Sequence, residues 1–336
     1  MSRANLGWLF YKEMYNEGNN DTHIKSTLHK ITSISTIQND IETIGDFSFE
    51  LTTIYPGLII GSGYIHGISS DEDTKMGFYF DHTTGLPIIP ASSIKGVLRS
   101  LFGLNEKDKY QEEKKVFIKE MLKEISIEEN IDIEALSKEI FEGLRYDQDS
   151  QEYKNISIYK RDIFYDASIV RCGYDGLIQE DYITPHKKAL KNPLPLKIIE
   201  VAGGVTFRFN FELQDGIISA NEKERLFVYL LLWHGLGAKT NVGYGQFVEW
   251  SDDDWKRFDN RQNRRKQERE KKGLDGFELF IKELEEFKKK DNNMVKKIKN
   301  YKGEMEDIER VKEIVNSKKG ADKFHNRIIK YLDSLQ

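Results

Sequence analysis

The stretch GVTFRFNFEL, residues 204–213, decides the fold class, because apolar and polar side chains alternate along it. In an extended chain, successive side chains point to opposite faces, so a period of two predicts a strand with one buried face. We expect that face to consist of Val205, Phe207, Phe209, Phe211 and Leu213.

Three further segments have the character of strands. Asp46–Tyr55 repeats the alternation, with Tyr55 on the same side as the apolar residues. Ile163–Val170 is a strand candidate, and Gln246–Trp250 is predicted to form a short final strand. Asp166 is the one carboxylate within the second of these segments, where we expect it to satisfy a nearby backbone group or an arginine.

Two helices complete the pattern. Ser219 and Glu222 form a capping-box sequence at the start of a predicted helix, Ala220–His234. Ser92 or Ser93 is predicted to cap a second helix, whose apolar positions recur at helical spacing. Both helices lie between predicted strands.

The resulting order is strand, helix, strand, strand, helix, strand, which is the ferredoxin-like arrangement that RNA-recognition motifs share. The sequence therefore predicts an α+β, ferredoxin-like (RRM-like) core within residues 1–250. A helical insertion at about 104–160 and a basic, proline-containing excursion at about 171–200 would interrupt it. Residues 251–336 are rich in Lys and Glu and predict a charged helical extension, whose basic run at 256–272 we interpret as a solvated helix face.

The composition and net charge of the chain argue against several classes of function. The 336 residues carry a net charge of −5, which argues against an independent nucleic-acid binder but allows local contact within an assembly. The single cysteine, Cys172, excludes an intramolecular disulfide and a cysteine-based zinc site, and fits a reducing cytoplasm. We find neither a membrane-length apolar run nor a signal-peptide pattern, and no histidine pair has metal-ligand spacing. No cofactor is expected.

The glycine-rich stretch HGLGAKTNVGYGQF, residues 234–247, is the leading candidate for ligand contact. Glycine lets backbone amides approach a phosphate, lysine adds charge, and tyrosine can stack on a base. The stretch follows a helix C-terminus, whose dipole repels anions, so binding would depend on the loop itself. The alternative is an ordinary tight connection between a helix and a strand. The candidate residues are Gly235, Gly237, Lys239, Thr240, Asn241, Gly243, Tyr244 and Gly245.

A second candidate is GLPIIPASSIKGVLR, residues 85–99. A helix N-terminus favours anions, so Ser92, Ser93, Lys95 and Arg99 could hold backbone phosphates. The competing interpretation is a capped helix with an incidental basic face. Elsewhere, Asp81 with His82, or Asp181 with His186, could supply acid and base groups for RNA cleavage, although a histidine in a polar loop is usually just solvated.

These two motifs together resemble the RAMP superfamily of CRISPR-associated proteins: residues 85–99 its first-helix motif, and residues 235–247 its glycine-rich loop. Four more segments resemble the sixth-subunit type of the type III-B (Cmr) effector complex, namely ANLGWLFYK at 4–12, FYFDHTTG at 78–85, FYDASIV at 164–170 and EDYITPH at 180–186. The resemblance covers most of residues 1–250. Ala91 departs from it, since a glycine is usual there.

The resemblance implies a non-catalytic backbone subunit of an RNA-guided complex, seated toward the 3′ end of the guide RNA. Its implied partners are guide RNA, target RNA, neighbouring RAMP subunits and the small helical subunit. The 171–200 excursion would act as a thumb between guide and target, with Lys187, Lys188 and Lys191 as candidates. Contacts should be to the RNA backbone, because guide sequences vary. A repeat-processing endoribonuclease and a free phosphate- or nucleotide-binding module are the alternatives.

Overall fold

The computed structural model describes residues 5–16, 20–37, 43–61, 74–103, 109–127, 131–183, 195–272, 311 and 313–315. The chain divides into two compact units, Met1–Ser251 and Asp252–Gln336. The first is a mixed α/β unit with antiparallel sheets, and it contains both motifs identified above.

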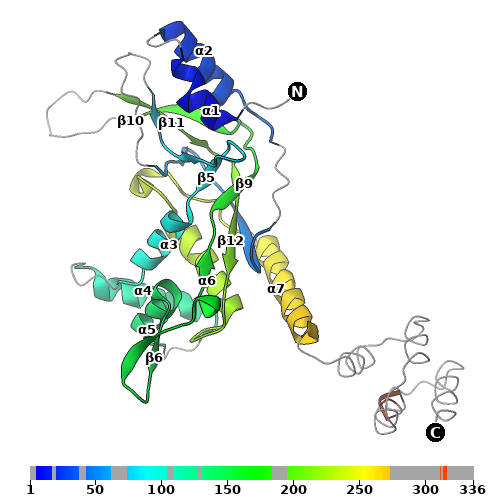
Figure 1. Ribbon diagram of the computed structural model, residues 1–336. Coiled ribbons are helices and arrows are strands. Elements are labelled where there is room, and N and C mark those ends of the chain that lie inside the picture. Colours follow the sequence, from blue (N-terminus) through cyan, green and yellow to red (C-terminus); the bar gives the residue numbers. More distant parts are fainter. Residues whose placement is uncertain are drawn as a thin grey trace, which may run out of the picture. The chain divides into compact units, whose positions relative to one another are not determined.

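The main sheet of the first unit forms around β12 (Thr206–Glu212), the strand predicted at 204–213. Its strand order is β1-β12-β9-β5-β4, and β8 also pairs with β12; Figure 1 shows β5, β9 and β12 side by side. All the pairings described in this sheet are antiparallel. The bounds of the strands are β1 (Phe47–Thr52), β4 (Tyr79–Phe80), β5 (Pro87–Ile89), β8 (Ile163–Phe164) and β9 (Ala167–Arg171).

The predicted apolar face of β12 is buried, which confirms the assignment made from the period of two. The ring of Phe49 on β1 stacks against Phe209 and Phe211, with centroids 5.3 and 5.5 Å apart. Phe227 of α6 (Ala220–His234) lies 5.4 Å from Phe211, so the helix covers this face. Burial of each such ring contributes about 1.5–3 kcal/mol, which makes this aromatic cluster the centre of the core.

The two predicted helix starts have different outcomes. At α6, Ser219 and Glu222 form the predicted capping box. The prediction that Ser92 or Ser93 caps the other helix is wrong, because α3 (Ala91–Ser100) begins before both serines, with Pro90 at its N-cap. The carboxylate of Asp166 instead accepts a hydrogen bond from the Ala91 N–H at 2.7 Å. Asp166 therefore satisfies a backbone group, as expected.

A β-bulge places Asp166 for this contact. The segment predicted as one strand at 163–170 is divided into β8 and β9. Phe164 pairs with Phe211 and Ser168 with Arg208, so four steps along one strand match three along the other. The extra residue turns the chain toward α3.

The predicted strand at 246–250 is absent, and only one isolated bridge joins Phe247 to Thr53. Hydrogen bonds flank it, from Ile54 N–H to the Gln246 oxygen at 3.1 Å and from Val248 N–H to the Thr52 oxygen at 2.7 Å. Past Tyr55, Pro56 has no N–H to donate, and the next hydrogen bond runs from the Gly245 N–H to the Gly57 oxygen. The chain turns there, and Tyr55, predicted to face the core, is exposed.

A second sheet lies beside the glycine-rich loop, with the order β10-β11-β2 and with β3 (Lys75–Met76) parallel to β11. The strands β10 (Ile178–Ile183), β11 (Leu196–Ala202) and β2 (Gly57–Leu58) are antiparallel. Much of the predicted excursion at 171–200 is therefore a β-hairpin. Its candidate lysines, Lys187, Lys188 and Lys191, lie outside the described residues.

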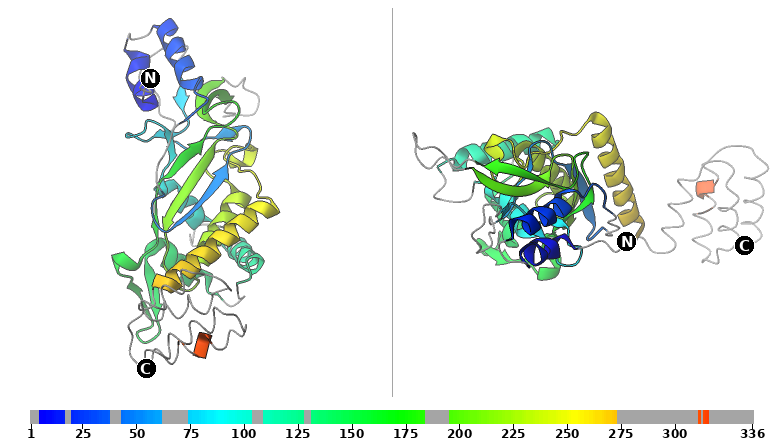
Figure 2. Two further views of the ribbon diagram at one scale, coloured as in Figure 1. Left: turned by 90° about the vertical axis from the view of Figure 1, so that its right-hand side faces the viewer. Right: turned by 90° about the horizontal axis from the view of Figure 1, so that it is seen from above.

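The remaining elements of the first unit lie at its two ends (Figures 1 and 2). At one end are α1 (Leu6–Tyr11), η1 (Glu13–Tyr15) and α2 (Asp21–Thr32). At the other is the insertion predicted to be helical. It contains helices α4 (Gln111–Glu124), α5 (Ile133–Ser137) and η2 (Lys138–Glu142), but also the hairpin β6 (Leu144–Asp147) and β7 (Glu152–Asn155), with η3 (Ile158–Lys160) after it. The hairpin has little apolar alternation, so its sequence did not indicate strands.

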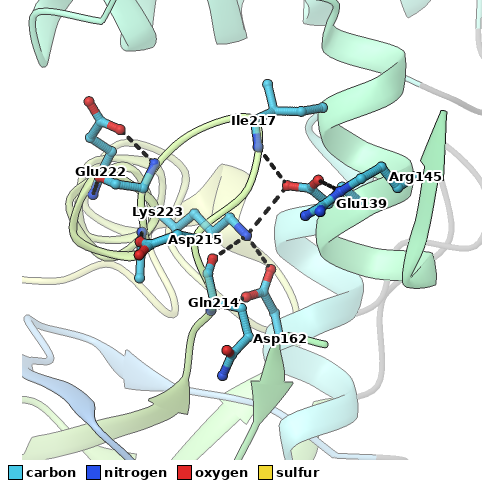
Figure 3. Close-up of polar contacts among 10 residues, drawn as sticks. Glu139, Arg145, Asp162, Gln214, Asp215, Ile217, Glu222 and Lys223 are labelled. Carbon is cyan, nitrogen blue, oxygen red and sulfur yellow. Dashed lines mark hydrogen bonds and ion pairs between the residues drawn. The ribbon is translucent and has the colours of Figure 1, made fainter. Parts of the chain in front are cut away.

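A buried ion cluster connects the insertion to α6 (Figure 3). The ammonium group of Lys223 lies 2.7 Å from the carboxylate of Asp162 and 3.7 Å from that of Glu139. Glu139 also accepts hydrogen bonds from the Arg145 side chain and the Ile217 N–H, both at 2.9 Å. Buried charges need such partners. The cluster therefore fixes η2, through Glu139, against α6, through Lys223, and against Asp162, immediately before β8.

The second unit is described mainly through α7 (Asp252–Lys272). Asp252, Asp253 and Asp254 occupy its first turn, where negative charge favours helix formation. Arg257 pairs with Asp254 at 2.7 Å, one turn away. Among the helices that the structure describes, none has the length and apolar character needed to cross a membrane.

Candidate RNA interface

The glycine-rich loop is held against the second sheet by backbone hydrogen bonds. Leu236 N–H donates to the Gly245 oxygen at 2.8 Å, which closes the base of the loop. Gly245 N–H donates to the Gly57 oxygen, and Ala238 N–H to the Ile59 oxygen, both at 2.7 Å. The loop is therefore a braced structure before any ligand binds.

Close packing of the chain explains two of its glycines. A Cβ atom on Gly237 would lie 2.3 Å from the Ile59 oxygen, and one on Gly245 would lie 1.9 Å from the Leu236 oxygen. Both residues also have positive φ, which favours glycine. These glycines let the chain approach itself, so the glycine content of the loop is not by itself a sign of ligand binding.

The tip of the loop presents the polar candidates. Lys239 adopts the left-handed conformation, with φ 59° and ψ 31°, and the short helix η4 (Thr240–Val242) follows it. Lys239 and Asn241 are exposed, and Thr240 is half-buried. A lysine with positive φ is uncommon and implies that the surrounding structure holds it there. The tip therefore exposes an ammonium group and an amide group at the surface.

Tyr244 faces the second sheet. Its hydroxyl donates a hydrogen bond to the carboxylate of Asp181 on β10. Burial, together with this bond and the charge of Glu200, raises the pKa of the Tyr244 hydroxyl above its usual value. The side chain thus anchors the loop to β10, a role that its sequence position did not indicate.

Glu200 lies behind Tyr244 and is fully buried. Gln179 donates to one of its carboxyl oxygens at 2.7 Å and to the Pro56 oxygen at 2.5 Å. The other carboxyl oxygen, Oε2, has no hydrogen-bond partner in the described structure. Burial raises the pKa of Glu200 to about 7, with the nearby charge of Asp181 acting in the same direction. The loop is therefore supported by a carboxyl group that is largely neutral below that pH.

The candidate residues on α3 form a separate group, since α3 packs on β8 and α6. Ser92 is exposed and Ser93 half-buried. The ammonium of Lys95 lies 5.5 Å from the centre of the Phe164 ring, and burial, followed by the charge of Arg99, lowers the pKa of Lys95. Arg99 pairs with Glu142 at 2.5 Å. With Asp166 on the Ala91 N–H, this helix start already holds a carboxylate.

Of the two predicted acid–base pairs, only Asp81 with His82 lies wholly within the described residues. Asp81 accepts a hydrogen bond from the Thr84 N–H at 2.6 Å. Burial would raise its pKa, but hydrogen bonds from Thr84 and Thr83 and the charge of His82 outweigh that effect and lower it. His186 lies outside the described residues, and Asp181 is engaged by Tyr244. Within the described part of the chain, no group of three or more His, Cys, Asp or Glu side chains is arranged to hold a metal ion.

A model of the RAMP superfamily matches residues 50–248, which include both sequence motifs and the loop just described. The chain belongs to the RAMP superfamily. This match covers more than half of its length, from β1 to the bridge at Phe247.

Among solved structures, the chain is similar to a protein of the type III-B Cmr-beta complex bound to cognate target RNA, with 26% identity and a TM-score of 0.38. That match covers 61% of this chain and 58% of the other, so the chain spans little over half of that protein. It is also similar to Cmr6 from Pyrococcus furiosus, with 20% identity, a TM-score of 0.37, and coverage of 64% of this chain and 100% of that one. No protein of curated function is significantly similar.

Proposed function

We propose that this RAMP-superfamily chain is a guide-RNA-binding structural subunit of a type III-B CRISPR effector complex. We assign it to the sixth-subunit type, seated toward the 3′ end of the guide RNA and without a cleavage role. The observation that carries the RNA contact is the braced loop, which holds Lys239 and Asn241 exposed at its tip. The subunit type rests on the four segments whose sequences resemble it.

The core is proposed to be ferredoxin-like, with a reduced fourth strand. In that fold the strands lie in the spatial order fourth, first, third, second, and all neighbours are antiparallel. The bridge at Phe247, β1, β12 and β9 follow this order, with α3 between the first and second strands and α6 between the third and fourth. The glycine-rich loop then connects the second helix to the vestigial strand.

Recognition is proposed to act on the sugar–phosphate backbone. Lys239 supplies a point charge, Asn241 and Thr240 supply hydrogen bonds, and none of these requires a particular base. The group on α3 contributes through Ser92, Ser93 and Lys95, whereas Arg99 must first exchange its Glu142 partner for a phosphate. The net charge of −5 then fits a subunit that grips RNA locally and binds protein elsewhere.

The other proposed contacts follow the same assignment. Guide and target RNA, neighbouring RAMP subunits and the small helical subunit are the proposed partners, in the cytoplasm. Lys187, Lys188 and Lys191 belong to the proposed thumb, and residues 251–336 form an extension appended to the 1–250 domain.

The test is Lys239→Ala in the full-length protein assembled with its partner subunits, with a fluorescein-labelled single-stranded RNA and anisotropy over a range of salt. Alanine retains Cβ, so the left-handed backbone is unaffected and only the charge is lost. We expect weaker binding, to a similar extent for unrelated RNA sequences, and a slope of log affinity against log salt reduced by about 1.

Lys160→Ala is the matched control. Lys160 is an exposed lysine in η3, which precedes β8, the strand that pairs with the C-terminal end of β12. A loss confined to one RNA sequence would contradict backbone recognition. Specific cleavage of repeat RNA by the purified protein, abolished by His82→Ala, would instead support the endoribonuclease alternative.

A further inference from the structure

Tyr55 is an exposed aromatic side chain beside the glycine-rich loop. Its exposed fraction is 86%, whereas tyrosines in folded proteins usually bury most of the ring. It follows β1, in the turn that leads to β2. An aromatic ring presented in this way has a large face available to a ligand.

The backbone on both sides of Tyr55 is bonded to the loop. The preceding residue, Ile54, donates its N–H to the Gln246 oxygen at 3.1 Å. Two residues later, the Gly57 oxygen accepts the N–H of Gly245 at 2.7 Å. Tyr55 therefore stands between two fixed points on the glycine-rich loop.

The turn itself is rigid. Pro56 has a fixed φ, and its carbonyl oxygen accepts a hydrogen bond from Gln179 at 2.5 Å. On another side, a Cβ atom placed on Gly203 would lie 3.0 Å from the Tyr55 nitrogen, so the chain is closely packed there. The backbone that carries the exposed ring is thus already ordered, so ligand binding would cost little further conformational entropy there.

Space is open next to this turn. A Cβ atom added to Gly243 would meet only Pro56 Cδ, at 3.5 Å, within 4 Å. From Gly243 the chain leads back through η4 to Lys239, so the exposed tyrosine and the exposed lysine belong to segments joined by the same backbone hydrogen bonds. Tyr244, the tyrosine suggested by sequence, faces the second sheet instead.

Single-stranded RNA is recognised by this combination of groups. Cationic and amide groups hold the backbone, and exposed aromatic rings stack on unpaired bases without regard to sequence. We propose that Tyr55 is a base-stacking residue for single-stranded RNA whose backbone is held at the Lys239–Asn241 tip. This inference rests on the proposed function and adds a base contact to it.

The experiment compares Tyr55→Ala and Tyr55→Phe with the wild-type protein, all full length and assembled with the partner subunits, by anisotropy with a single-stranded RNA. Tyr159→Ala is the matched control, because Tyr159 is also 86% exposed and lies in η3. A second RNA has the same length but abasic sites in place of its central bases. Since Tyr55 is exposed, its replacement should leave the thermal midpoint unchanged.

We expect Tyr55→Ala to weaken binding of the ordinary RNA about tenfold, and Tyr55→Phe and Tyr159→Ala to bind within about twofold of the wild type. The abasic RNA should bind wild type and Tyr55→Ala equally, because no base is present to stack. Equal affinity of Tyr55→Ala and wild type for the ordinary RNA would overturn this inference, while a weakened Lys239→Ala variant would leave the proposed function intact. No RNA binding by the assembled wild type would overturn both.

Discussion

Replacement of Glu200 by glutamine should change how the stability of the protein depends on pH. Glu200 is fully buried behind the glycine-rich loop, with one carboxyl oxygen unpartnered. Its pKa is raised from 4.5 to about 7, mainly by burial. Glutamine has the shape of the protonated side chain and carries no ionisable group, so it removes the titration alone.

The sign follows from the direction of the shift. A carboxyl group whose pKa is raised by folding favours the folded state while it is protonated. That contribution is fully present below the unfolded pKa of 4.5 and is lost as the pH rises through about 7. With about 1.4 kcal/mol for each pKa unit, the wild type should lose about 2–3 kcal/mol of this contribution between pH 5 and pH 8.

The assay is urea unfolding of the wild type and Glu200→Gln at pH 5 and pH 8. The difference between the two proteins isolates Glu200 from other titrating groups, such as Asp162, whose pKa is also raised by burial. We expect the stability of the variant to increase by about 2–3 kcal/mol relative to the wild type over this interval. Glu180→Gln, on the paired strand β10, controls for loss of a carboxylate from the same hairpin. A difference that is equal at both pH values would show that Glu200 is ionised in the folded protein and would refute the reasoning.

Two further predictions concern stability. Lys223→Met leaves two buried carboxylates without their ammonium partner and should cost about 3–5 kcal/mol in urea unfolding; a loss below about 1 kcal/mol would contradict the role of the ion cluster. Gly245→Ala places a methyl group against the Leu236 oxygen at positive φ and should lower stability by more than about 1 kcal/mol, as measured by thermal unfolding. Gly96→Ala is the control: Gly96 lies in α3, and no atom lies within 4 Å of the added Cβ. This variant should raise stability by about 0.5–1 kcal/mol, because alanine favours a helix more than glycine does. A loss of stability there would show that the comparison measures something other than steric contact.

Local signals in the sequence were sufficient for the central strand and for one helix. The period of two along 204–213 correctly indicated the buried face of β12, because alternation is a property of the extended chain itself. The capping box at Ser219 likewise depends on residues three apart. Both features require only neighbours in sequence, and both are present in the structure.

Features set by distant residues were missed. The start of α3 depends on Asp166, which is 75 positions away in sequence, and a β-bulge brings it there. The hairpin β6–β7 has polar strands without a clear alternation, and the strand expected at 246–250 is reduced to one bridge. In each case the decisive hydrogen-bond partner lies in another element.

By itself, the sequence determined that the first unit combines helices with antiparallel strands, which face of β12 is buried, and the position of a glycine-rich loop that contains a lysine. Only the tertiary structure decided what the members of that loop do. Gly237 and Gly245 allow the chain to pack on itself, and Tyr244 faces Asp181. Tyr55, which alternation had placed on the buried face, is exposed beside the loop. The reason is physical: periodicity reports which side of a strand a residue occupies, whereas the strand's end, and what meets it there, depends on contacts between distant segments.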